Sequence, residues 1–144
     1  MHEIRTEIEI AAKPEQVWSL LIDFNAYPQW NPFIRSLAGV VKNGERLTAF
    51  IQPSGTKGMT FRPTVLAALP NQELRWLGHL LLPGIFDGEH YFQIESIEQN
   101  RVRFIQGEKF SGLLVGLLKA KLDGETKSSF IAMNQALKLL AEAE

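Results

Sequence analysis

The two residues best suited to proton chemistry are His90 and Glu108, which lie in consecutive segments predicted to be strands, 87–97 and 101–110. Only the short loop 98–100 separates these segments, so we expect them to pair as an antiparallel hairpin. Counting outward from the loop places His90 opposite Glu108. Directly opposed residues have Cβ atoms ~4.5–5.5 Å apart, close enough for an imidazole to hydrogen-bond a carboxylate. Such a pair can take up and return protons, as a general acid and base do.

The even-numbered residues of this hairpin are predicted to form its inner face. Odd positions carry mainly charged side chains, whereas most even positions are apolar. The expected opposed pairs are Ile97 with Arg101, Ser96 with Val102, Ile94 with Phe104 and Phe92 with Gln106.

Polar residues interrupt this apolar face. Gln106 shares it with His90 and Glu108, and Asn134 adds an amide from the apolar face of the last helix. Three interpretations of this group stay open: a hydrogen-bonded set that fixes packing, the polar end of a ligand pocket, or a catalytic pair.

The strand before this hairpin, 73–82, should extend the same face. By the same parity we expect Trp76 beside Ile94, Gly78 beside Phe92 and Leu80 beside His90. Gly78 would leave a gap in the floor of the sheet, where a ligand or the last helix could approach.

The remaining elements follow from periodicity and turn signals. Alternation from Ile4 to Ile10 predicts a strand, and Lys13-Pro14-Glu15 predicts the start of a helix with one apolar face. The helix ends at Tyr27–Phe33, where two prolines disfavour regular helix and the aromatics plug one end of the fold. Further strands are expected at 34–41, 45–53 and 58–69. A closing helix begins at Asp123-Gly124-Glu125, runs to about Ala143 and buries Phe130, Met133, Leu137, Leu140 and Ala141.

Composition restricts the function classes. The 144 residues suit one domain, 1–144, and the net charge of −1 predicts no nucleic-acid partner. The chain has no cysteine and only three histidines, of which His79 faces away from His90, so we expect no metal site and no cofactor. The first residues do not read as a signal peptide, and no apolar run approaches the ~20 residues that span a bilayer. We therefore expect a cytoplasmic protein without stable membrane insertion.

The whole chain resembles the START/polyketide cyclase-like (SRPBCC) superfamily, and within it the small bacterial single-domain members. The matching segments are Ala12–Trp18, Tyr27–Phe33, Leu74–Trp76, Gly88–Phe92 and Gly107–Gly112. The resemblance implies an α+β helix-grip fold: a curved seven-stranded antiparallel sheet around a long C-terminal helix, with two short helices after the first strand. It also implies an apolar cavity between the sheet and that helix.

The expected partner is a small hydrophobic molecule, such as a lipid, an isoprenoid or a polyketide-like compound, bound without catalysis. The alternative is a cofactor-independent cyclase or dehydratase that uses His90 and Glu108. The segment Leu113–Leu122 is expected to cover the cavity mouth. The candidate ligand-binding residues are Trp30, Phe33, Trp76, His90, Phe92, Phe104, Gln106, Glu108, Phe130, Met133, Asn134 and Leu137.

Overall fold

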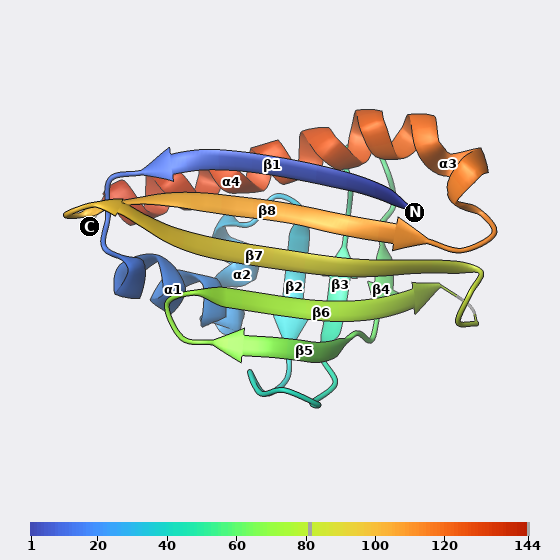
Figure 1. The fold of residues 1–144 in the computed structure, drawn as a ribbon, viewed down its shortest axis with the longest axis horizontal. Coiled ribbons are helices and arrows are strands. Elements are labelled where there is room, and N and C mark those ends of the chain that lie inside the picture. The colour runs from blue at the N-terminus through green and yellow to red at the C-terminus, as the bar shows by residue number, and fades with distance from the viewer. Residues whose placement is uncertain (81, 144) are drawn as a thin grey trace.

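The larger of two antiparallel sheets forms one layer of the molecule (Figure 1). The computed structural model describes residues 1–80 and 82–143. In spatial order the strands of this sheet are β1 (His2–Ile10), β8 (Arg101–Ser111), β7 (Phe86–Glu98), β6 (Glu73–Leu80) and β5 (Thr64–Leu69). The first strand in sequence therefore pairs with the last.

The smaller sheet runs behind the larger one, with its strands crossing the direction of β6 and β7 (Figure 1). It contains β2 (Ile34–Ala38), β3 (Thr48–Ile51) and β4 (Met59–Phe61). Backbone hydrogen bonds between 44–47 and 63–65 join the two sheets. The described strands thus number eight in two linked sheets, where one seven-stranded sheet was expected.

This difference arises at Pro63, in the middle of the predicted strand 58–69. Proline has no amide hydrogen for a ladder, and it restricts the residue before it. The segment therefore divides into β4 and β5, which belong to different sheets. Leu81, within the predicted strand 73–82, lies outside the described residues.

Two short helices follow β1, as expected. Helix α1 (Pro14–Ile22) has proline in its first turn and buries Val17, Trp18 and Leu21. A 3₁₀ turn leads to α2 (Tyr27–Trp30), a single helical turn. The prolines do not prevent this turn, because Pro28 stands at the start of α2, where its missing amide hydrogen costs nothing.

The C-terminal helix starts earlier than predicted. It begins with α3 (Val115–Lys121), passes through a π-helical segment at Leu122–Thr126 and continues as α4 (Lys127–Glu142). The prediction that Asp123 starts this helix was wrong, because the backbone accommodates Asp123-Gly124-Glu125 in the wider π turn. Helix α4 packs on β1 and β8, so a curved antiparallel sheet surrounds a long C-terminal helix and the helix-grip fold is confirmed.

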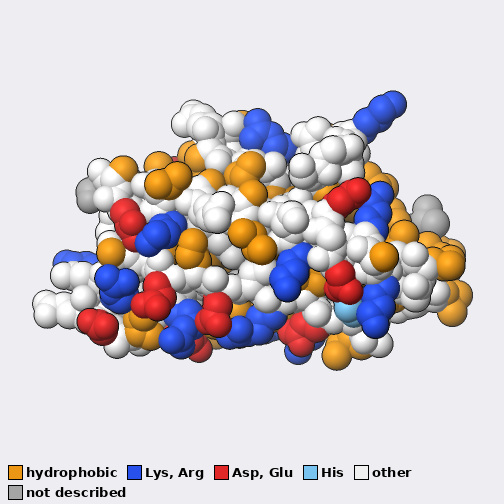
Figure 2. All heavy atoms as spheres, turned by 90° about the horizontal axis from the view of Figure 1, so that it is seen from above, with side chains coloured by type: hydrophobic (Ala, Val, Ile, Leu, Met, Phe, Trp, Pro, Cys, Tyr) orange, Lys and Arg blue, Asp and Glu red, His pale blue; other side chains and the backbone are white. Residues whose placement is uncertain are grey.

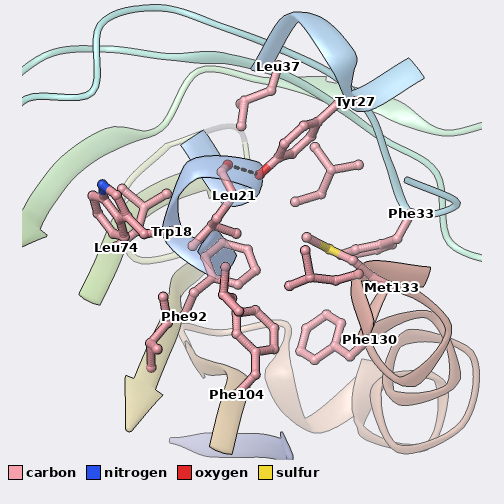
Figure 3. Close-up of a cluster of buried hydrophobic side chains, with 14 of the residues drawn as sticks. Trp18, Leu21, Tyr27, Phe33, Leu37, Leu74, Phe92, Phe104, Phe130 and Met133 are labelled. Atoms are coloured by element: carbon pink, nitrogen blue, oxygen red, sulfur yellow. Dashed lines mark hydrogen bonds between the residues drawn. The ribbon is translucent and has the colours of Figure 1, made fainter. Parts of the chain in front are cut away.

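The main core lies between α1, the larger sheet and α4. Figure 3 shows side chains from these three places converging, including Trp18, Phe92 and Phe130. Five of the candidate ligand-binding residues are fully buried in this core: Phe92, Phe104, Phe130, Met133 and Leu137.

The β7–β8 register confirms most of the predicted pairs, including His90 with Glu108. A bulge at Ile97 places Glu98 opposite Arg101, so the expected Ile97 pair was wrong.

The predicted β6–β7 register was wrong by four residues. The prediction that even-numbered residues of β6 lie opposite even-numbered residues of β7 was right. Trp76 lies opposite His90, and Gly78 lies opposite Gly88. Leu80 pairs with Phe86.

Candidate functional site

A histidine–glutamate pair lies on the inner face of the larger sheet. Nδ1 of His90 is 3.0 Å from Oε1 of Glu108, across adjacent strands. The side chain of His90 is 1% exposed and that of Glu108 is 17% exposed. The histidine is therefore enclosed, while the glutamate retains access to the space beyond it.

A chain of hydrogen bonds connects His90 to β1 and α4. Nε2 of His90 lies 2.9 Å from Oε1 of Gln106. The amide nitrogen of Gln106 donates to Oδ1 of Asn134 at 2.8 Å. The amide of Asn134 donates to the hydroxyl of Thr6, which in turn donates to the backbone carbonyl of Gln106, each at 2.8 Å. These four side chains are all buried.

The ends of this chain determine the direction of its hydrogen bonds. Both ends are backbone carbonyls, of Gln106 and of Phe130, and a carbonyl can only accept. The side-chain nitrogen of Gln106 must therefore face Phe130 and Asn134, which leaves its oxygen facing His90. It follows that Nε2 of His90 carries a hydrogen.

The contact between His90 and Glu108 then requires one further proton. With Nε2 protonated, a neutral ring would present the lone pair of Nδ1 to the carboxylate at 3.0 Å, and two acceptors repel at that distance. One proton must lie between Nδ1 and Oε1. The pair is thus an imidazolium with a carboxylate or a neutral imidazole with a carboxylic acid, and its net charge is zero.

Aromatic rings surround His90. Trp76 stacks on the imidazole with ring centroids 5.4 Å apart, and Phe33 stacks at 6.3 Å. Phe92 and Phe130 lie at 4.8 and 5.0 Å. These four rings enclose the imidazole and fix its orientation toward Glu108 and Gln106.

A cavity of about 380 Å³ opens beside Glu108, between the ends of β6, β7 and β8, the smaller sheet and α3. Its volume lies within the range of small-molecule sites. The walls are mainly apolar, and Glu108 is the one carboxylate among its described lining residues. The lining comprises Phe33, Ile51, Pro53, Thr56, Lys57, Gly58, Met59, Phe61, Pro63, Trp76, Gly78, His79, Leu80, Phe86, Gly88, Glu108, Phe110, Leu118, Lys121, Leu122 and Thr126.

The His90–Glu108 pair divides the inner face of the sheet into two halves. On one side, Phe92 and Phe104 are tightly packed in the core. On the other, Gly88 and Phe110 line the cavity. The pair therefore stands at the boundary between packed and hollow interior.

The structure places the candidate ligand-binding residues in three groups. Phe33, Trp76 and Glu108 line the cavity. His90, Gln106 and Asn134 form the hydrogen-bonded chain behind Glu108. Trp30 packs on Tyr27 in α2 with ring centroids 5.3 Å apart, and the five core residues named above also lie away from the lining.

Sequence reasoning missed most of the lining. Four of the missed residues have even numbers and belong to the inner face of the sheet, which continues past His90 and Glu108. They are Leu80, Phe86, Gly88 and Phe110. The expected gap at Gly78 does open into the cavity. The residues of β4 lie within the predicted strand 58–69 but were not singled out as lining, whereas those of α3 lie within the segment 113–122 that was expected to cover the cavity mouth.

No cluster of three metal-ligating side chains occurs within residues 1–80 and 82–143. Over the same residues, no helix is long and apolar enough to cross a membrane. Acidic and basic side chains are interspersed over the face seen in Figure 2.

Residues 1–141 match the family model described as polyketide cyclase/dehydrase and lipid transport. The chain belongs to this family. The resemblance seen in the sequence is therefore confirmed, and the family as a whole combines cyclase chemistry with lipid transport. No match was found among curated protein sequences.

Solved structures of similar fold include both enzymes and a START protein. The ZhuI aromatase/cyclase from a Streptomyces species has a TM-score of 0.79 at 15% identity, covering 98% of this family member and 93% of that chain. A START superfamily protein from Mycobacterium smegmatis has a TM-score of 0.72 at 22% identity, with 97% and 99% covered. A norcoclaurine synthase from Thalictrum has a TM-score of 0.74 at 12% identity, with 99% and 94% covered. At these identities the likeness concerns the fold.

Proposed function

We propose that this protein binds and carries a small hydrophobic ligand, such as a lipid, an isoprenoid or a polyketide-like compound, in the cavity beside Glu108. The cavity itself is the observation that carries the proposal: about 380 Å³, with apolar walls and a single carboxylate among its described lining residues. Filling such a space with an apolar molecule removes apolar surface from water, which contributes roughly 25 cal/mol per Å². We also propose that the protein is cytoplasmic, as expected from its sequence. Cell fractionation would test this location.

Helix α3 has the features of a cover for this cavity. Leu118 and Lys121 line the cavity, while Leu117, on the same helix, is 83% exposed. A hydrophobic ligand could enter between α3 and β4, because both elements contribute to the lining. This supports the expectation that the segment 113–122 covers the mouth.

Native mass spectrometry of the purified protein tests the proposal directly. We expect a non-covalent adduct whose mass identifies the chemical class of the ligand. Leu118→Trp should remove the adduct because the indole would occupy the cavity. The matched variant Leu117→Trp adds the same group to the exposed side of α3 and should retain it. An adduct that survives Leu118→Trp would contradict the proposal.

The second candidate function is a cyclase or dehydratase reaction on a polyketide-like ligand. The specific observation in its favour is that Nδ1 of His90 lies 3.0 Å from Oε1 of Glu108, which lines the cavity. A positioned acid and base typically contributes ~10²–10⁴-fold to a rate. His90 would keep the proton available, and Glu108 would exchange it with the bound molecule.

Glu108→Gln separates the two functions. A carrier should change its ligand affinity by ~1–3 kcal/mol, the range for a lost hydrogen bond to a charged group. An enzyme should lose turnover of a poly-β-ketone substrate while binding stays nearly constant. A change in thermal stability alone, with affinity and turnover preserved, would contradict both functions of Glu108.

A further inference from the structure

We infer that the cavity selects ligands that present a hydrogen-bond donor, such as a hydroxyl, phenol or ammonium group, to Oε2 of Glu108. This inference rests on the proposed function, because it concerns the same cavity. It adds a chemical requirement that apolar walls alone do not impose.

The two oxygens of Glu108 have different environments. Oε1 contacts His90 at 3.0 Å, whereas Oε2 accepts no hydrogen bond from any residue that the structure describes. The shared proton lies between Oε1 and Nδ1, so Oε2 carries no hydrogen whether the proton belongs to the histidine or to the glutamate. In both forms Oε2 is an acceptor that a ligand can use.

Two glycines keep this acceptor in position. Gly88 lies two residue pairs away from Glu108 along the β7–β8 ladder, on the same face, and a Cβ atom on Gly88 would overlap Oε2. Gly78 lies opposite Gly88 on β6, and both glycines line the cavity. The carboxylate therefore extends over a floor that has no side chains.

The other charged side chains in the described lining do not donate a hydrogen bond to Oε2 of Glu108. Lys57 and Lys121 are exposed, and Nδ1 of His79 is engaged with Asp87 at 2.7 Å. A ligand without a donor would displace water from Oε2 and leave it unpaired. Burying an acceptor without a partner is costly, especially when the group is charged. A donor on the ligand removes that cost.

A pair of probes with the same apolar body tests this requirement. 1-Naphthol carries a hydroxyl donor, and 1-methoxynaphthalene replaces it with an ether that cannot donate. Dissociation constants of both should be measured by NMR titration with the wild-type protein. We expect 1-naphthol to bind at least about tenfold more tightly, as one hydrogen bond to a charged acceptor predicts.

Three variants assign that preference to Glu108. Glu108→Leu removes the acceptor, and Gly88→Ala displaces it while keeping the carboxylate in the chain. Both should reduce the preference to within about twofold. Gly78→Ala adds the same methyl group on the opposite strand, where its nearest contact would be an ordinary one with Pro63 at 3.6 Å. This variant should keep the preference, even if both affinities fall together.

The outcomes separate this inference from the proposed function. Equal binding of the two probes to the wild-type protein would overturn the donor requirement and leave the apolar site standing. A preference that persists in both Glu108→Leu and Gly88→Ala would also overturn it. Binding of neither probe would overturn the requirement together with the proposed function.

Discussion

Nε2 of His90 lies 2.9 Å from the side-chain oxygen of Gln106, and the histidine donates the hydrogen bond between them. Because the amide of Gln106 is oriented by two acceptors, the Nε2 hydrogen should be present in the resting protein. We expect long-range ¹H–¹⁵N correlation spectra near pH 7 to show His90 with Nε2 protonated. An unprotonated Nε2 would contradict the orientation of the whole hydrogen-bonded chain.

Replacing Asn134 should destabilise the fold more than replacing its exposed neighbour. Asn134→Leu would remove one buried hydrogen-bond partner from the amide of Gln106 and one from the hydroxyl of Thr6. We expect a loss of ~1–3 kcal/mol in the free energy of unfolding, measured by urea denaturation. Gln135→Leu makes the same exchange on the exposed face of α4 and should change stability by less than about 0.5 kcal/mol. Equal effects of the two variants would contradict this prediction.

Gly107 should not tolerate a side chain. It lies opposite Tyr91, and a Cβ atom there would overlap the tyrosine ring and the backbone oxygen of Ile4. We expect Gly107→Ala to lower the free energy of unfolding by ~1–3 kcal/mol through overpacking. Gly116→Ala is the control, because the position lies in α3 with open space around it, and it should stabilise by about 0.5–1 kcal/mol. Thermal unfolding of both variants provides the measurement.

The two tyrosines should remain protonated while the protein is folded. The pKa of Tyr27 is raised mainly by burial and further by the charge of Asp23. The pKa of Tyr91 is also raised mainly by burial, and further by its hydrogen bond to Glu3. The folded protein therefore holds more protons than the unfolded chain above about pH 10, so stability falls as the pH rises. Each tyrosine contributes a slope of about 1.4 kcal/mol per pH unit.

Spectrophotometric titration of the phenols tests that expectation. Phenolate absorbance should appear only together with unfolding, followed by far-UV circular dichroism. A phenolate signal near pH 10 in the folded protein would contradict the role of burial at these positions.

The sequence was most informative where turns are short. The loop 98–100 leaves little freedom between β7 and β8, so counting from it predicted that His90 faces Glu108. The connection between β6 and β7 is longer, and several registers with the same parity satisfy its apolar pattern. Parity was therefore predictable, whereas the pairing of Trp76 with His90 depends on tertiary packing.

The position of the cavity had no comparable signal. Alternation identifies the inner face of a strand, but it does not distinguish a side chain packed in the core from one that borders a hollow. Phe104 and Phe110 share one face of β8, yet only Phe110 lines the cavity. The distinction arises from the paired glycines of the floor and from α3, which closes a space that α4 does not fill.

The pairing of the first strand with the last has a consequence for folding. His2 pairs with Phe110 and Ile10 with Val102, so most of the chain separates the two partners. Contacts between such distant residues form slowly, because a long loop must close before they stabilise the chain. During synthesis, β1 leaves the ribosome early and has no partner until β8 has followed it. Until then its apolar face stays open to other chains, so efficient folding of this protein depends on keeping that first strand from pairing elsewhere.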